Sequence, residues 1–342
     1  MRLRILPKTE IPPMVRALQA DYRVIGPKAK GPQFVFAPID DPAELRLDYN
    51  ITILPPKVAL QPPEERVVTI DLRGEPAVQP VIEAVPTVIL GAHTCDLHAL
   101  RLLDQAFAND YPDAHYLERR KQTLIVSIEC LSPCDEHSFC KDMGTLTAES
   151  GYDLHLTDIG DAYTVHVGSE AGERLLEKYL NSRAAVDADV RRLNDALSAK
   201  WPRFTYRLTF DAAELPTILA RAYDHPIWKE LGERCLACAS CTNVCPTCYC
   251  FNMIDSMALT QDQAERIRRW DSCQLDEFAR VAGGENFREA RAARQRHRFF
   301  RKGKWLSERF EGVRGCVGCG RCIRACVAKI NIVDTFNAIK TA

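Results

Sequence analysis

The first 200 residues contain short apolar runs that predict buried strands. PTVILGA (86–92) and TLIVSIE (123–129) are rich in β-branched residues, as strands in the middle of a sheet are. YDLHLTD and YTVHVG alternate apolar and polar positions on either side of Gly160-Asp161, which predicts a β-hairpin. DLHALRLLDQAF and SEAGERLLEKYL have the spacing of amphipathic helices. The pattern predicts an α/β domain over residues 1–204, ending in a connecting helix and linker from about 181.

The remaining residues, 205–342, have a helical pattern. AAELPTILARAY and PIWKELGER read as helices. MIDSMALTQDQAERIRRW (253–270) contains no proline or glycine, and REARAARQRHRFF (288–300) is rich in good helix formers. We therefore expect an α+β protein in which the N-terminal α/β domain is followed by an all-helical domain.

The chain contains fifteen cysteines, and their positions indicate its chemistry. Four lie in the first half, none occurs in the next 94 residues, and eleven lie between Cys235 and Cys326. The chain shows no export signal, and the cytosol keeps thiols reduced, so clustered cysteines indicate metal binding rather than disulfides. The gap predicts two separate metal regions.

Two cysteine runs share one spacing. Each has the pattern C-x2-C-x2-C-x3-C, first in CLACASCTNVCP and again in CVGCGRCIRAC. In two-cluster ferredoxins, the first three cysteines of such a run bind one 4Fe-4S cluster and the fourth binds the other cluster. The predicted ligands of cluster one are Cys235, Cys238, Cys241 and Cys326. Those of cluster two are Cys316, Cys319, Cys322 and Cys245. The C-terminal domain is thus predicted to be an alpha-helical ferredoxin-like domain.

The alternatives for these cysteines are zinc and unligated thiols. Zinc sites use paired C-x2-C halves and do not need a third cysteine at the same spacing. The second run departs from the ferredoxin pattern because Val327 stands where proline is expected, but proline supplies no ligand. Cys248, Cys250 and Cys273 are left over, and we interpret them as packing residues or neighbours of the clusters.

The four N-terminal cysteines follow the two predicted apolar strands. They are Cys95, Cys130, Cys134 and Cys140. Since the ends of neighbouring strands lie close together, these thiols could hold a third cluster; zinc or free thiols are the alternatives. Asp96 and Asp135 could replace one thiol as an oxygen ligand. Four histidines lie near in sequence and are weaker candidates: His93, His98, His115 and His137.

A basic run extends from Arg288 to Lys304, with eight Lys or Arg residues and one acid, Glu289. It could be a solvated helix face, a docking face for an acidic partner, or a nucleic-acid contact. No base-reading motif accompanies it. The net charge of about -1 also gives the whole chain no attraction to nucleic acid or anionic lipid.

Composition and missing motifs exclude other functions. The chain is 46% hydrophobic and 27% charged, as soluble globular proteins are. It shows neither a signal peptide nor an apolar run of about 18 residues, so we expect a cytoplasmic protein without direct membrane insertion. GxGxxG after a strand, GxxxxGK[ST] and HExxH are all missing. We therefore predict a non-catalytic electron-transfer subunit, with no catalytic residue and no nucleotide or flavin site of its own.

The combined motifs resemble a known family. GAHTCDLHAL, SIECLSPC, YDLHLTDIGDAY with GSEAG, ERCLACASCTNVCPTCYCF, RRWDSC, VAGGENF and GCVGCGRC together look like the beta subunit of cytoplasmic nickel-iron hydrogenases of the sulfhydrogenase type. They are also similar to the A subunit of anaerobic sulfite reductase. The resemblance covers nearly the whole chain. It implies a relay of single electrons between a flavin subunit that handles NAD(P)H and a catalytic subunit of the nickel-iron hydrogenase or siroheme sulfite reductase type.

Two further functions compete with this interpretation. An iron-sulfur redox sensor would use the basic run on nucleic acid and would be retained on DNA in a salt-dependent manner. A self-sufficient reductase would turn over its substrate alone, which the missing nucleotide motif argues against.

Overall fold

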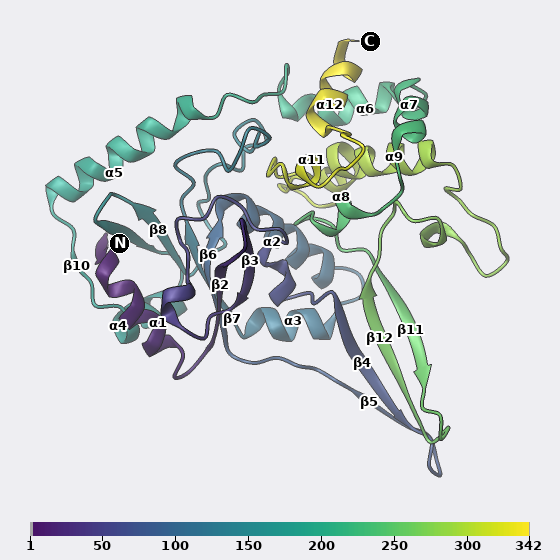
Figure 1. The fold of residues 1–342 in the computed structure, drawn as a ribbon, viewed down its shortest axis with the longest axis horizontal. Coiled ribbons are helices and arrows are strands. Elements are labelled where there is room, and N and C mark those ends of the chain that lie inside the picture. The colour runs from purple at the N-terminus through teal and green to yellow at the C-terminus, as the bar shows by residue number, and fades with distance from the viewer. Residues whose placement is uncertain (1–2, 342) are drawn as a thin grey trace.

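An eight-stranded mixed sheet forms the centre of the N-terminal part (Figure 1). The structure, a computed structural model, describes residues 3–341. The strands follow the spatial order β10-β1-β9-β8-β7-β6-β2-β3, with β2, β6, β7 and β8 parallel and the other pairs antiparallel. Their bounds are β1 Arg4–Pro7, β2 Arg23–Lys30, β3 Gln33–Pro38, β6 Thr87–His93, β7 Thr123–Ile128, β8 Leu154–Asp158, β9 Ala162–Val167 and β10 Arg183–Ala184.

Helices cover both faces of this sheet. Every residue of β6 is buried, as the continuous apolar run predicts for a parallel strand between two layers. Val88 and Leu90 pack toward α1 and α4, whereas Ile89 packs toward α2 and α3. The helices of this part are α1 Ile11–Leu18, α2 Thr94–Ala108, α3 Ala114–Lys121, α4 Glu170–Tyr179 and α5 Asp187–Lys200. The predicted strands, the hairpin β8–β9 and the connecting helix α5 are confirmed.

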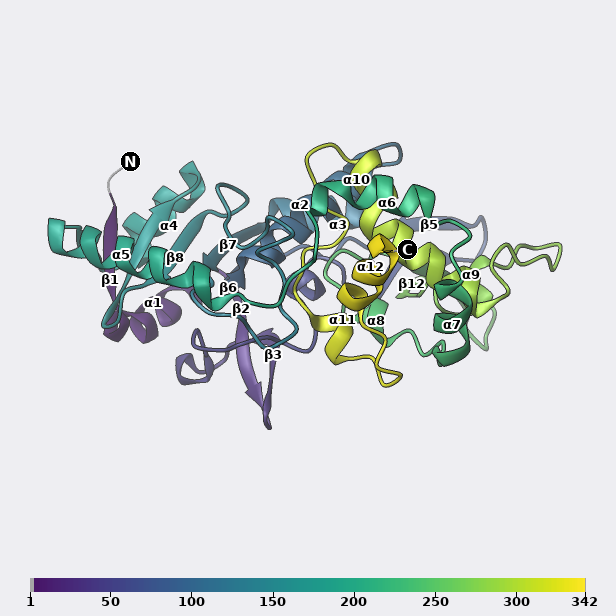
Figure 2. The ribbon, with the colours of Figure 1, turned by 90° about the horizontal axis from the view of Figure 1, so that it is seen from above.

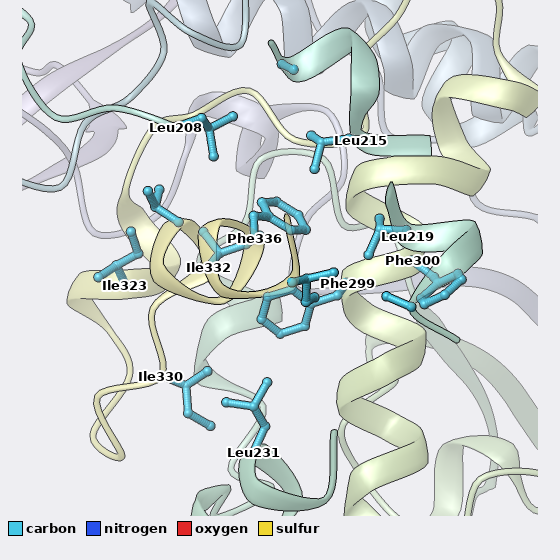
Figure 3. Close-up of a cluster of buried hydrophobic side chains, with 14 of the residues drawn as sticks. Leu208, Leu215, Leu219, Leu231, Phe299, Phe300, Ile323, Ile330, Ile332 and Phe336 are labelled. Atoms are coloured by element: carbon cyan, nitrogen blue, oxygen red, sulfur yellow. The ribbon is translucent and has the colours of Figure 1, made fainter. Parts of the chain in front are cut away.

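The C-terminal helices pack around an apolar core beside the N-terminal sheet (Figure 2). Figure 3 shows Phe299 and Phe336 at the centre of this core, with Ile332 and Leu219 on either side of them and Phe300 beyond Leu219. The helices are α6 Leu215–Arg221, α7 Ile227–Arg234, α8 Ser240–Asn243, α9 Arg291–Phe300, α10 Leu306–Arg309, α11 Arg321–Arg324 and α12 Ile332–Thr341. A π-helical segment, Arg301–Trp305, joins α9 to α10. The helices predicted in 212–223, 226–234 and 288–300 are present.

The helix predicted over 253–270 is wrong. This segment forms a β-hairpin of β11 (Phe251–Met257) and β12 (Gln263–Trp270). It pairs with β4 (Glu64–Asp71) and β5 (Ala77–Pro80) in a second sheet of order β11-β12-β4-β5, which projects from the body as an arm (Figure 1). The C-terminal part is therefore not all-helical.

Long-range pairing explains why helix propensity does not decide this segment. Arg268 lies opposite Glu65 in the β12–β4 register, and the two buried side chains form an ion pair at 2.7 Å. The same guanidinium also pairs with Asp113. A buried charge needs such partners, which a helix at this place would not reach. The arm joins strands from both sides of residue 204, so the boundary at 204/205 stays a prediction. Among residues 3–341, no helix combines the length and the apolar character needed to span a membrane.

Candidate functional site

The first cysteine run and the last cysteine of the second run surround one cavity. This cavity is lined by Cys235, Cys238, Cys241 and Cys326. Cys235 follows α7 directly, and α8 begins between Cys238 and Cys241. Left-handed backbone at Ala237 and Ala239 curls the loop around this space. The structure thus brings together the four residues predicted for cluster one, including one that is 85 positions from its nearest partner (326 minus 241).

Hydrogen-bond donors point at the sulfurs of this cavity. The Gln295 side-chain amide donates to Cys235 Sγ at 2.8 Å, and the backbone N–H of Ala237 donates to the same sulfur at 3.3 Å. The backbone N–H of Ile330 donates to Cys326 Sγ at 3.2 Å. Such bonds stabilise negative charge on sulfur and raise the reduction potential of a bound centre.

A second cavity adjoins the first. It is lined by Cys245, Cys316, Cys319 and Cys322, and Cys241 and Arg298 line both cavities. These are the four residues predicted for cluster two. Because the two spaces share wall residues, centres held in them would be near neighbours.

Buried cations face these thiols. Arg298 lies in α9, and Lys302 lies about one helical turn later in the π-helical segment. Both side chains are buried. Burial opposes the charge of Lys302, but the sulfurs of Cys245 and Cys248 hold its pKa above the ordinary value. In the described residues, neither side chain forms an ion pair with a carboxylate. Their counter-charge must therefore come from sulfur or from a centre bound to it.

The thiols themselves favour a bound metal group. Burial raises the pKa of Cys241 to about 11 and that of Cys316 to about 12, so both carry a proton at neutral pH unless a metal replaces it. In residues 3–341, no three His, Cys, Asp or Glu side chains have the spacing that holds a single ion. Four thiols around a cavity, with amide donors and cations behind them, are the donor set that a 4Fe-4S cluster uses.

The four N-terminal cysteines also come together. Cys95 lies in the first turn of α2, and the other three follow β7. Cys95, Cys130 and Cys140 belong to one buried cluster, and Cys134 lies beside Cys130 and Cys140. The Thr94 hydroxyl donates to Cys130 Sγ at 3.6 Å. The strand ends thus gather these thiols as the sequence predicts.

This N-terminal group lies against the second cysteine run. Cys319 and Val317 belong to the same buried cluster as Cys95 and Cys140. The Phe139 N–H donates to the Gly318 carbonyl at 2.9 Å, and the Thr145 hydroxyl donates to the Val317 carbonyl at 2.6 Å. The three groups of thiols therefore follow one another through the molecule.

A buried ion pair fixes this contact. Arg321 lies between Cys319 and Cys322, and Asp96 follows Cys95. The guanidinium of Arg321 donates to both carboxylate oxygens of Asp96, at 2.8 and 3.2 Å, and to the carbonyl of Thr52 at 3.1 Å. The two charged side chains are 2% and 1% exposed.

The other oxygen and nitrogen candidates have partners of their own. Asp135 pairs with Arg324 and accepts from the His137 N–H, so neither it nor Asp96 is directed at a thiol. His98 bonds the Thr147 carbonyl at 2.7 Å and His115 the Val67 carbonyl at 3.0 Å. His93 is the exception, because its Nδ1 lies 3.7 Å from Cys134 Sγ and its ring stacks on Tyr49.

Several residues at the site were not found by sequence reasoning. Gln295, Arg298, Lys302 and Arg321 all contact or face the thiols. The sequence held one signal for Arg298 and Lys302. Together with Arg294, they are spaced four residues apart and share one helix face within the run 288–304. A solvated face is the wrong interpretation for these three, since they are 5%, 4% and 5% exposed.

Comparison with known proteins agrees with this geometry. Residues 234–330 match the family of 4Fe-4S dicluster domains, a range that contains all eight cysteines of the two adjoining cavities. The chain is similar to sulfhydrogenase 2 subunit beta of Pyrococcus furiosus, with 35% identity over 341 residues that cover 99% of each chain. No solved structure matches the chain significantly. The chain belongs to the sulfhydrogenase beta-subunit family and contains a 4Fe-4S dicluster domain.

Proposed function

We propose that this chain is the iron-sulfur electron-transfer subunit of a cytoplasmic nickel-iron hydrogenase complex of the sulfhydrogenase type. The observation that carries the proposal is the pair of adjoining cavities, each lined by three cysteines of one run and the last cysteine of the other. When bound, a 4Fe-4S cluster supplies a centre that gains or loses one electron at a time. Two such centres in adjoining cavities would lie close enough together to pass electrons from one to the other.

The chain's own residues set the conditions of this relay. Cys235, Cys238, Cys241 and Cys326 would hold the first cluster, and Cys245, Cys316, Cys319 and Cys322 the second. Arg298 and Lys302 compensate negative charge in the buried space, and Gln295 donates to a ligand sulfur. The apolar side chains around them exclude water, which strengthens each of these interactions.

A third cluster at the N-terminal cysteines extends the relay. Cys95, Cys130, Cys134 and Cys140 form a buried thiol group in contact with the loop that carries Cys319. Burial raises the pKa of Cys130 to about 11, so this group too would stay protonated without a metal. We infer a 4Fe-4S cluster there, on the N-terminal side of the second cavity.

Partners would dock near the two ends of the series of thiols. Cys238 is exposed, which places the first cavity near the surface, whereas Cys319 is buried in the middle of the series. A flavin subunit that handles NAD(P)H and a nickel-iron catalytic subunit would exchange electrons at opposite ends. The full-length similarity to a sulfhydrogenase beta subunit favours this catalytic partner over a siroheme sulfite reductase.

Anaerobic purification from the native host tests the proposal. We expect flavin- and nickel-containing subunits to copurify, and the chain to hold about twelve irons if all three groups bind a cluster or about eight if two do. Copurification with a siroheme subunit would instead support the sulfite reductase assignment. A chain that is isolated alone and without iron would refute the relay.

The N-terminal cluster needs a separate test. The double variant Cys130→Ser/Cys134→Ser should lose about four irons and keep the about eight of the C-terminal cavities. The matched control is Cys248→Ser, which removes a thiol outside every proposed ligand set and should lose none. An unchanged iron count in the double variant would exclude a cluster at the N-terminal cysteines.

A further inference from the structure

Three cysteines stand outside the proposed ligand sets, and the base of the β11–β12 hairpin brings two of them together. Phe251 pairs with Trp270 at the end of the hairpin. One position further, the Asp271 N–H donates to the Cys250 carbonyl at 3.0 Å. Cys273 follows two residues later, so Cys250 and Cys273 lie on neighbouring segments.

The two side chains contact each other. The Cys273 thiol donates a hydrogen bond to the Cys250 sulfur. Cys273 is buried, and its sulfur also accepts from the Gln274 side-chain amide at 3.4 Å. Cys250 is half-buried. One member of the pair is thus fully buried, and the other is partly exposed.

The surroundings of the pair carry positive charge. Lys57 is 2% exposed, lies over the Trp270 ring at 4.1 Å and donates to the Cys248 carbonyl. The hydrogen bond from Cys273, with the charges of Arg301 and Lys302, lowers the pKa of Cys250 to about 6. Among residues 3–341, none of these three cations forms an ion pair with a carboxylate. Such surroundings favour the thiolate, which is the form that undergoes thiol oxidation.

The pair lies near proposed ligands of both cavities. Cys248 donates to Cys245, a proposed ligand in the second cavity, and its own thiol lies near Cys250. On the other side, Cys273 lies near Cys241, a proposed ligand in the first cavity. The pair therefore lies near the first cavity directly, through Cys241, and near the second cavity through one intervening residue, Cys248.

We propose that Cys250 and Cys273 form a dithiol/disulfide pair that exchanges two electrons with the two flanking iron-sulfur sites, one electron with each. In the oxidative direction, the S–H bond of Cys273 breaks and its sulfur forms one S–S bond with the Cys250 thiolate. One proton leaves, and one electron passes to each oxidised site. Reduction is the reverse. The inference rests on the proposed function, because the flanking sites must accept electrons.

Thiol trapping at controlled potential tests the pair. The purified chain is poised anaerobically with redox dyes, denatured in excess iodoacetamide, and analysed by mass spectrometry. We expect peptides joined through Cys250 and Cys273 at high potential and two alkylated cysteines at low potential. The ratio should change tenfold per about 30 mV, as a two-electron couple requires, and not per about 59 mV.

Variants separate the pair from other roles. Cys250→Ser and Cys273→Ser should each abolish the joined peptide and keep the iron count, and Cys248→Ser should leave the joined peptide unchanged. If wild-type protein with its full iron shows both cysteines alkylated at every potential, the inference is wrong. A loss of about four irons in either variant would also overturn it, because the residue would then be a cluster ligand. A chain without iron would refute the proposed function instead, whatever the state of the pair.

Discussion

Single cysteine variants test whether the two runs exchange their last ligands. The alternative is that all four cysteines of each run bind the same cluster. Cys326 belongs to the second run by sequence but lines the first cavity. We predict that Cys326→Ser loses the same cluster as Cys238→Ser, because a serine oxygen is a poor replacement for a thiolate ligand. Cys245→Ser should likewise match Cys316→Ser. The measurement is iron content with EPR of the reduced protein. A spectrum of Cys326→Ser that matches Cys316→Ser would contradict the exchange.

The Arg321–Asp96 pair offers a second test with a single residue. Arg321→Met leaves the Asp96 carboxylate buried without a partner, and we expect a loss of about 3–5 kcal/mol in the free energy of unfolding. The double variant Asp96→Asn/Arg321→Met, which carries neither charge, should lose less than the sum of the two single variants. Anaerobic urea unfolding measures both.

The matched control for this pair lies on the same helix. Arg324 pairs with Asp135, but its side chain is 38% exposed. Arg324→Met should therefore cost less than about 1 kcal/mol. If both arginine variants lost the same free energy of unfolding, burial of the Arg321–Asp96 pair would not increase its contribution to stability.

Spacing predicts ligands better than it predicts their surroundings. The two runs specify which eight cysteines gather, because three thiols at x2 intervals can only wrap one loop. Whether the side chains of Arg298 and Gln295 point at the thiols depends on how α9 is rotated about its axis in the core. That rotation is set by contacts such as those of Phe299 and Phe300, which no local pattern specifies. The four N-terminal cysteines are irregularly spaced, so their grouping could be predicted only from the strand ends that precede them.

At the scale of elements, the arm shows where local patterns fail. Residues 253–270 favour a helix by composition, yet they form β11 and β12. Their partner strand β4 lies far away in sequence, with Arg268 and Glu65 separated by 203 positions. Strand propensity depends on such neighbours, so the hairpin could not be found without knowing them. The strands β6 to β9, whose apolar runs are continuous or alternate strictly, were predicted correctly.

The loop of the second run requires glycine where it meets the Cys140 loop. Gly318 has a left-handed backbone with φ of 67°, and an added Cβ would lie 2.6 Å from the Cys140 backbone. We predict that Gly318→Ala lowers the free energy of unfolding by about 2–4 kcal/mol, from backbone strain and overpacking together. Thermal or urea unfolding of the iron-loaded chain measures the effect.

Gly283→Ala is the control for this change. An alanine Cβ at that position would meet nothing within 4 Å. Its unfolding free energy should stay within about 0.5 kcal/mol of the parent. A tolerated Gly318→Ala would mean that the contact between the second run and the Cys140 loop is not tight.

At the scale of the whole molecule, we expect cofactor binding and folding of the C-terminal part to be coupled. Without metal, the buried thiols of Cys241 and Cys316 keep their protons, and Arg298 and Lys302 lose the counter-charge of a bound centre. We predict that anaerobic iron chelation exposes the backbone of α9 and α12 to hydrogen exchange and leaves β6 and β7 protected. Equal protection of all four elements before and after chelation would show that the C-terminal core forms without the clusters.

The most direct test of the relay is an anaerobic reductive titration of the purified, iron-loaded chain, followed by EPR with iron counted in the same sample. The account predicts about eight or about twelve irons and uptake of at least two electrons per chain, one for each cluster. It also predicts EPR signals broadened by magnetic interaction, since the two cavities share Cys241 and Arg298 in their walls. A chain that binds no iron, or one that is loaded with iron and accepts no electrons, would contradict it.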